Sequence, residues 1–220
     1  MATFAELQFL TTDGVMGVPL GVAAEIVFYF ILFSALLEVS GGGQLFINLA
    51  MRATGSMRGG PAKAAVVSSG LMGTISGSAT ANVVGTGIFT IPLMKRLGFT
   101  PRFAGAVEAV ASTGGQLMPP IMGAGAFIMA DMTGIPYLRI AVAATLPAII
   151  YYSSLFAMVD FQARRSNLRG LLKSQLPSAK RTLLERGLLI IGLVVLVYYI
   201  FAGFSLIWAA WWALVWTFFL

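Results

Sequence analysis

Small polar side chains interrupt two apolar stretches, and their oxygen atoms make them the best candidates for binding an ion. The first group lies within residues 73–82, Gly-Thr-Ile-Ser-Gly-Ser-Ala-Thr-Ala-Asn, at the centre of a stretch without any charge, residues 64–94. Hard cations such as sodium take oxygen ligands, and broken membrane helices supply further carbonyl oxygens. The sequence therefore predicts a cation site here, with the side-chain candidates Ser76, Ser78, Thr80, Asn82 and Thr86.

The second group is the run Ser-Thr-Gly-Gly-Gln-Leu-Met-Pro-Pro at residues 112–120. Glycines after Thr113 favour the end of a helix, and proline is accepted in the first turn of a helix because its missing N–H has no partner there. We expect a broken helix over residues 101–133, with the prolines in the first turn of its second half. The positive N-terminal end of that half, and that of the helix that returns from the first group, would favour a carboxylate.

Each of these groups also has a simpler explanation. Gly-x-x-x-Gly spacing and serine-rich helix surfaces are typical of close packing between membrane helices. Glu108, six residues beyond Arg102, must face protein, water or a partner, so it either makes a structural pairing or carries a proton or ion. The chain has no cysteine or histidine, and it shows no Ser/Lys pair or aspartate dyad at a suggestive spacing, which argues against an intramembrane enzyme.

The composition is that of a membrane protein, because 58% of the 220 residues are hydrophobic and only 10% are charged. No segment has the composition of a soluble domain. The net charge of +6 comes from short basic segments between apolar runs, so we expect these segments to contact lipid headgroups and not nucleic acid. The predicted fold class is therefore all-α and integral to the membrane.

The uncharged stretch 64–94 is flanked by basic residues on both sides, Lys63 before it and Lys95, Arg96 and Arg102 after it. A single span would leave basic residues at both membrane faces, against the usual cytoplasmic excess. A re-entrant hairpin that turns at residues 76–82 keeps both basic ends in the cytoplasm. Each arm of about 13 residues rises only about 20 Å, short of the ~30 Å hydrocarbon core, so the tip is predicted near the midplane.

The remaining segments are assigned from apolar length and charge. The four tryptophans within residues 205–220 suit a lipid or subunit contact. The arrangement leaves every basic residue except Arg139 on the cytoplasmic side and the N-terminus outside the cytoplasm. We expect an extracytoplasmic segment at 1–17, a span and an amphipathic connector at 18–63, a second span at 136–160 that is kinked at Pro147, a basic interfacial arm helix at 161–182, and apolar C-terminal helices at 183–220.

Four strings resemble the large membrane subunit of TRAP transporters, the tripartite ATP-independent periplasmic transporters. They lie at residues 58–69, 73–82, 91–96 and 104–120, for example Gly-Thr-Ile-Ser-Gly-Ser-Ala-Thr-Ala-Asn and Ala-Ser-Thr-Gly-Gly-Gln-Leu-Met-Pro-Pro. The resemblance covers about residues 15–170 in continuous order. It is closest to the TAXI-associated branch, in which the small and large membrane subunits are fused in one chain.

The resemblance implies half of an inverted-repeat, elevator-type secondary transporter in a bacterial or archaeal cytoplasmic (inner) membrane. It implies sodium-driven import of an organic anion that a periplasmic solute-binding protein delivers, a small membrane subunit or its fused equivalent as a partner, and no cofactor besides Na⁺. The positions that match the family's sodium motifs are Ser76, Gly77, Ser78, Asn82, Thr113, Gly114, Gly115 and Pro119, and those expected to meet the substrate are Ser78, Thr80, Asn82 and Gln116.

Only the first of the two inverted repeats is recognisable in these 220 residues. A second hairpin and a second broken helix are expected either further along a longer chain or on another chain. The alternative function is a non-transporting membrane module, a truncated product or scaffold that associates with a partner subunit.

Overall fold

The computed structural model describes residues 17–219, and within them every regular element is a helix. The predicted all-α fold is confirmed, while the predicted extracytoplasmic segment 1–17 lies outside the described residues except for Gly17. The elements in chain order are α2 (Val18–Val22), a π-helical turn (Ala23–Val27), α3 (Phe28–Val39), α4 (Gly42–Thr54), α5 (Gly60–Ser76), α6 (Ala79–Arg96), α7 (Pro101–Gly114), a 3₁₀ turn (Gly115–Leu117), α8 (Ala124–Thr133), α9 (Tyr137–Arg165), a 3₁₀ turn (Lys173–Gln175), α10 (Ala179–Arg186), α11 (Leu189–Phe201) and α12 (Leu206–Phe219).

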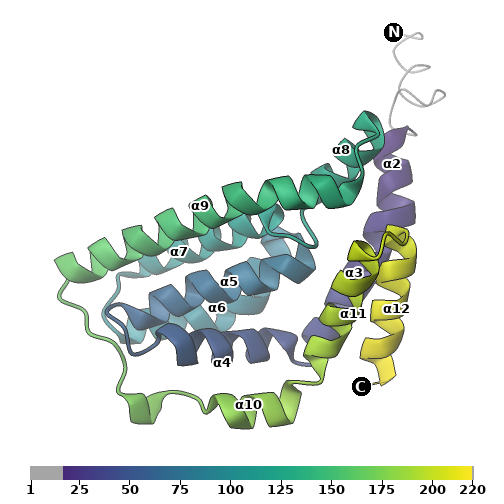
Figure 1. The fold of residues 1–220 in the computed structure, drawn as a ribbon. Helices are drawn as coiled ribbons and strands as arrows, with labels where there is room; N and C mark the ends of the chain where they lie inside the picture. The colour runs from purple at the N-terminus through teal and green to yellow at the C-terminus, as the bar shows by residue number, and fades with distance from the viewer. Residues whose placement is uncertain (1–16, 220) are drawn as a thin grey trace, which may run out of the picture.

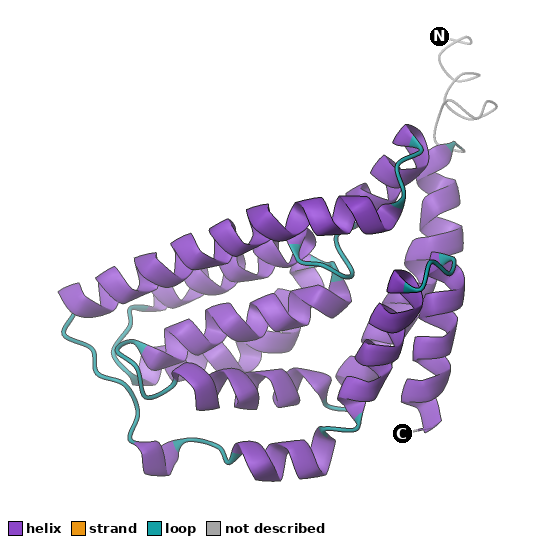
Figure 2. Ribbon diagram, in the orientation of Figure 1, coloured by secondary structure: helices purple, strands orange, loops and turns teal. Residues whose placement is uncertain are grey.

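The helices form two groups whose axes cross (Figures 1 and 2). Helices α4, α5, α6, α7 and α9 lie alongside one another, and α5 contacts all the other four. In the second group, α3 packs against α12, α12 packs against α11, and α2 continues the line of α3 through the π-helical turn. Helix α10 lies along α4 and leads back from the first group to the second, while α8 reaches from the first group to the top of α2.

Two helical stretches are long and apolar enough to cross a membrane, Val18–Val39 and Tyr137–Arg165. The bent pair α10 and α11 counts as a third if it forms one span. Helix α9 has 29 residues and is therefore about 43 Å long, and a helix that exceeds the ~30 Å hydrocarbon core is accommodated by tilting. Large apolar side chains such as Phe28, Ile149 and Trp211 are exposed on these groups, as lipid-facing side chains are.

The first group has its own core, in which α9 packs against α5 and α7. Val107 and Ala111 of α7 and Val159 and Ala163 of α9 are fully or almost fully buried there. At the end of the group where α5 begins, Lys63 donates to Asp160 of α9 over 2.6 Å. Arg164 pairs with the other carboxylate oxygen of Asp160 over 2.7 Å. The start of α5 is therefore held against α9 by packing and by the Lys63–Asp160 ion pair.

Both hairpin arms are longer than the 13 residues predicted. Helix α5 already begins at Gly60, after Gly59 in the left-handed conformation (φ +63°), with proline in its first turn. Helix α6 continues through Lys95 and Arg96, because basic residues are favourable at a helix C-terminus. At 17 and 18 residues, the arms rise about 26 Å, still less than the hydrocarbon core.

The predicted interfacial arm helix at 161–182 is wrong as a single helix. Helix α9 continues to Arg165, and Asn167 then takes a left-handed conformation (φ +51°) that stops it. Ser178 accepts from the Arg181 N–H and starts the separate α10. The segment between them docks on the α4–α5 connection, where the Leu171 N–H donates to the Gly55 carbonyl over 2.9 Å.

Candidate functional site

The hairpin turn is shorter than predicted and consists of Gly77 and Ser78. Gly77 adopts a left-handed conformation (φ +56°), which glycine takes without strain. Ser78 caps α6 by accepting from the Ala81 N–H over 3.3 Å. Because α6 begins directly after this cap, Thr80 and Asn82 lie in its first turn and not in the loop.

The break after α7 lies later than predicted. Helix α7 still includes Thr113 and Gly114, a 3₁₀ turn takes Gly115–Leu117, and the non-helical stretch is residues 118–123. The prolines therefore lie in this connection, and the prediction that they open the next half-helix is wrong. Helix α8 instead follows an extended Gly123, whose N–H donates to the Gln116 carbonyl over 2.9 Å.

The break is held by hydrogen bonds from two other elements. The Ile121 N–H donates to the Thr74 carbonyl in the last turn of α5 over 3.2 Å. The Tyr137 hydroxyl of α9 donates to the Pro120 carbonyl over 2.7 Å and accepts from the Met122 N–H over 3.3 Å. Non-helical backbone needs such partners inside an apolar setting. Sequence reasoning missed Tyr137, because nothing in its local pattern links it to the break.

The hairpin tip and the break border the same cavity, which has a volume of about 400 Å³. The N-terminal ends of α6 and α8 both reach it, through Ser78 and through Ala124 and Gly125. Such ends carry free N–H groups and a partial positive charge. The C-terminal end of α5, with a partial negative charge, reaches it at Ser76. The lining residues are Val27, Phe30, Ile31, Ser76, Gly77, Ser78, Gln116, Ile121, Met122, Gly123, Ala124, Gly125 and Phe127.

Four of the predicted site residues are thus brought together at this cavity, Ser76, Gly77, Ser78 and Gln116. The residues of the break that match the sodium motifs, Thr113, Gly114, Gly115 and Pro119, do not line this cavity. Thr113 is exposed, and its hydroxyl donates to the Ala109 carbonyl of its own helix over 2.8 Å.

The other predicted residues have separate surroundings. Thr80 is exposed and Pro119 is half-buried. Gly114 is buried where a Cβ atom would lie 3.1 Å from the Tyr152 ring of α9. Gly115 faces Gly73, and a Cβ atom on Gly115 would lie 2.8 Å from the Gly73 Cα. These glycines therefore serve close packing in the structure, as the simpler explanation of the motif proposed.

Asn82 is fully buried and ties the two hairpin arms together. Its side-chain N–H donates to the Ser69 carbonyl of α5 over 2.8 Å. A Cβ atom on Gly115 would lie 3.1 Å from the same nitrogen. The amide thus sits where α5, α6 and the break meet, behind the cavity.

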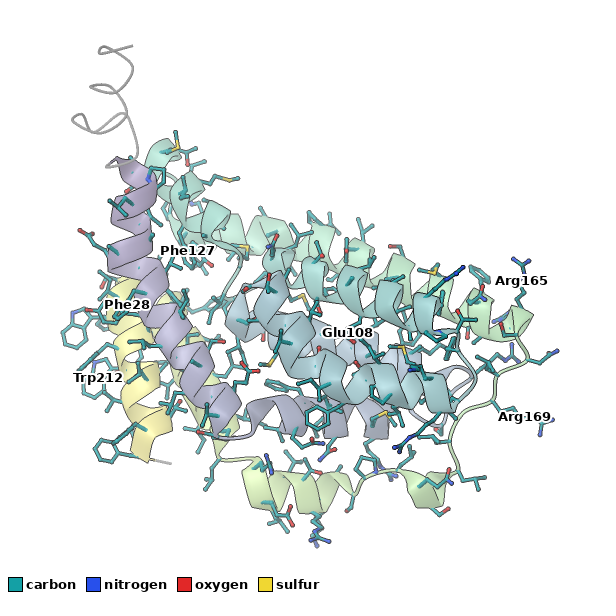
Figure 3. The ribbon with its side chains drawn as sticks, turned by 180° about the vertical axis from the view of Figure 1, so that it is seen from behind. Phe28, Glu108, Phe127, Arg165, Arg169 and Trp212 are labelled. Atoms are coloured by element: carbon teal, nitrogen blue, oxygen red, sulfur yellow. The ribbon has the colours of Figure 1, made fainter. Side chains whose placement is uncertain are left out.

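Glu108 lies in the middle of the first group, deep between α7 and the hairpin (Figure 3). It is fully buried, and four hydroxyl groups contact its carboxylate. Sequence reasoning singled out Glu108 but missed these partners, although a spacing of four residues puts Asn82, Thr86 and Thr90 on one face of a helix. The hydroxyl groups belong to Ser69, Thr86, Thr90 and Ser112.

A family model described as "Tripartite ATP-independent periplasmic transporter, DctM component" matches residues 1–220. Among curated proteins, an uncharacterized protein of Sinorhizobium fredii is 33% identical over 126 residues, which are 57% of this chain and 30% of that protein. The C4-dicarboxylate TRAP transporter large permease protein of Pseudomonas aeruginosa is 29% identical over 159 residues, 70% of this chain and 37% of that protein. The isethionate TRAP transporter permease protein DctMQ of Oleidesulfovibrio alaskensis is 30% identical over 118 residues, 53% of this chain and 17% of that protein.

The chain spans only about a third of the length of the first two of these relatives. The matching family is one of transporter permeases and not of enzymes, so the comparison excludes the intramembrane enzyme. The matches confirm the resemblance to the large membrane subunit of TRAP transporters, while its TAXI-associated branch stays a prediction.

Proposed function

Because this chain belongs to the DctM family, the large permease component of TRAP transporters, we propose that it forms half of a sodium-coupled importer of organic anions. The whole transporter would lie in a bacterial or archaeal cytoplasmic membrane and take its substrate from a periplasmic solute-binding protein. A small membrane subunit, or its fused equivalent, and a second inverted repeat would complete it. The DctMQ name of one relative supports fusion as one form of this assembly.

The observation that carries the proposal is the convergence of the hairpin tip and the helix break on one cavity. Two helix N-termini reach it, at Ser78 and Ala124, and such ends favour an anionic group such as a carboxylate. Gln116 adds a side-chain amide that is able to donate to the same group. Half-helix ends that face a substrate carboxylate are a recurring design of secondary transporters.

Sodium would bind at the same tip, on its oxygen-rich side. Ser76 and Ser78 supply hydroxyl oxygens, and the last turn of α5 ends in carbonyls without helical partners. Each sodium ion that moves inward along the membrane potential releases about 2.3 kcal/mol per 100 mV. An anion that moves inward costs the same amount per negative charge, so the membrane potential drives uptake only when two or more sodium ions, and more of them than the anion has charges, move with it.

The position of the hairpin ends supports re-entry from the cytoplasmic side. The start of α5 and the ends of α6 and α9 meet at one end of the first group, since Gly59 faces Ala163 and Phe99, and Gly98 faces Leu168. Basic residues concentrate at that end, as they do on the cytoplasmic side of membrane proteins. Because the arms are about 26 Å long, the tip would stop inside the bilayer. The hairpin also packs on α7 and α9, which suits an elevator-type movement of these helices as one body.

The test is uptake of a labelled C4-dicarboxylate or isethionate, the substrates in the names of two relatives, by the complete transporter in liposomes. We expect uptake to require an inward sodium gradient. Ser78→Ala should raise the sodium concentration for half-maximal uptake about tenfold, since a lost contact to an ion is worth about 1.4 kcal/mol or more. The measurement is initial rate against sodium concentration.

Thr100→Ala is the matched control. Thr100 caps α7 as Ser78 caps α6, by accepting from the Phe103 N–H over 3.3 Å, and each lost cap costs about 0.5–2 kcal/mol of stability. Only Ser78 borders the cavity, so Thr100→Ala should keep the sodium dependence of the parent. Uptake that proceeds equally well without sodium would rule out the coupling, and absence of any uptake by the complete assembly would favour the non-transporting module.

A further inference from the structure

Glu108 occupies a closed pocket of hydroxyl groups between the hairpin and α7 (Figure 3). Thr86 contacts one carboxylate oxygen of Glu108 and Thr90 contacts the other. Ser69 of α5 and Ser112 of α7 approach the first oxygen, each at 3.4 Å. All five residues are 3% exposed or less. Three helices thus contribute to one buried polar cluster.

This carboxylate has no cationic partner among the described residues, whose ion pairs are Lys63–Asp160, Arg164–Asp160 and Arg181–Glu185. An ionised carboxylate that is buried without a cation is costly, and it lowers that cost by taking a proton. No charged or titratable group of the surrounding elements makes a hydrogen bond to it within residues 17–219. These groups are Glu38 of α3, Arg52 of α4, Lys63 of α5, Lys95 and Arg96 of α6, Arg102 of α7, and Tyr137, Arg139, Tyr151, Tyr152, Asp160, Arg164 and Arg165 of α9.

The hydroxyl groups can form hydrogen bonds with Glu108 whether it is ionised or protonated. A threonine hydroxyl has one proton to donate and can also accept, whereas an ionised carboxylate only accepts. When Glu108 is ionised, Thr86 and Thr90 donate to it. When Glu108 is protonated, it donates to one threonine, and that threonine turns its own proton to a backbone carbonyl. Such carbonyls are in place, since Thr86 lies 2.7 Å from the Asn82 carbonyl and Thr90 lies 3.0 Å from the Thr86 carbonyl.

We propose that Glu108 and its four hydroxyl partners form a reversible proton-binding site, at which the carboxylate gains H⁺ to become a neutral carboxyl group and later releases it. The two protonation states differ only in the rotation of hydroxyl groups, so both fit the same helix packing. Sequence and cavity point to sodium at the hairpin tip, and this site adds a second ion of different chemistry behind it.

The proton site is connected through Asn82 to the place where the two hairpin arms meet the break. The Thr86 hydroxyl reaches both the backbone and the side-chain oxygen of Asn82, at 2.7 and 3.5 Å. Asn82 in turn holds the Ser69 carbonyl and lies beside Gly115 at the break. Rotation of the Thr86 hydroxyl therefore changes its hydrogen bonds to Asn82, the residue that contacts α5 and the break. A role of this link in transport rests on the proposed function, whereas proton binding does not.

The test is infrared difference spectroscopy of the whole protein in lipid across a pH titration. We expect a carboxyl C=O band that disappears as pH rises, is missing in Glu108→Gln, and remains in Glu185→Gln, which removes an exposed carboxylate of α10. Thr86→Val with Thr90→Val removes two donors that favour the ionised form, so the midpoint of the band should move about one pH unit or more upward.

Two spectroscopic outcomes would overturn the proposal. Either Glu108→Gln removes no band at any pH at which the protein stays folded, or the band that it removes never titrates. Because the spectra are recorded without transport, they stand apart from the sodium test. In the uptake assay, Glu108→Gln should abolish the dependence of the rate on a pH gradient and leave the dependence on sodium, which would separate the two ions.

Discussion

Tyr137 illustrates how single hydroxyl groups stabilise irregular backbone in an apolar protein. Its ring stacks on Phe127 at a centroid distance of 4.6 Å, and its hydroxyl serves both Pro120 and Met122. Tyr152 acts similarly, donating to the Ala111 carbonyl near the end of α7 over 2.8 Å. Each hydroxyl satisfies a backbone group that no helix supplies with a partner, which is the condition for a break at membrane depth.

Tyr137→Phe should therefore destabilise the break and leave the helices in place. The substitution leaves a buried carbonyl and a buried N–H without this partner, which costs about 1–3 kcal/mol. We expect a lower unfolding midpoint in detergent and faster hydrogen exchange at Met122. Tyr198→Phe, on the exposed face of α11, is the control and should change neither quantity. Equal behaviour of the two variants would show that the hydroxyl of Tyr137 does not hold the break.

At the level of elements, the hairpin and the broken helix approach each other where neither has a side chain. Gly73 of α5 and Gly115 of the 3₁₀ turn bring their backbones into direct contact. Small residues allow such contact between membrane helices, and interhelical hydrogen bonds such as that from Asn82 then reinforce it. This contact holds the hairpin tip next to the break, so that both border the cavity.

Gly73→Ala should disrupt this contact, because its Cβ atom would overlap the Gly115 backbone. Overpacking of this kind costs about 1–3 kcal/mol. Gly105→Ala in α7 is the matched control, since nothing lies within 4 Å of its Cβ position and alanine favours a helix by up to about 1 kcal/mol. Unfolding in detergent should show a lower midpoint for Gly73→Ala and an unchanged or higher one for Gly105→Ala. A tolerated alanine at Gly73 would contradict the packing described.

For the whole molecule, the decisive question is which ends of the helices share a side of the membrane. The chain contains no cysteine, so single cysteines report accessibility without background. Ser56 before α5 and Thr100 before α7 are both exposed, and so is Thr133 at the end of α8. A re-entrant hairpin puts the first two on one side, and a broken helix that changes sides puts the third on the other.

We expect Ser56→Cys and Thr100→Cys to react with an impermeant thiol reagent only from the cytoplasmic side. Thr133→Cys should react only from the outside. Labelling is measured in right-side-out and inside-out vesicles, with the cysteine-free parent as the blank. Reaction of Ser56→Cys and Thr100→Cys from opposite sides would show that residues 60–96 cross the membrane once and do not re-enter.

The helical nature of nearly every segment was predictable from the sequence, because apolar length and turn residues act locally. The apolar helical stretch within residues 18–63 and the helix pair of the hairpin were predictable from the apolar runs and from the basic residues that flank them. The predicted boundaries were less accurate at both ends of the hairpin. Gly59 and Gly98 delimit it with a positive φ, and the sequence shows the glycines but not which of them take that conformation. The arm helix failed because Asn167 ended α9 and Ser178 began a new helix.

By itself, then, the sequence determined the membrane class, the two interruptions and the oxygen-rich chemistry of the tip, all of which depend on residue type and spacing along the chain. Only the tertiary structure decided which of these groups meet. It brought Ser76, Ser78 and Gln116 to one cavity, turned Asn82 inward, and surrounded Glu108 with hydroxyl groups from three helices. The physical reason is that helix period and spacing specify a face, whereas the neighbour of that face depends on the packing of elements far apart in the chain.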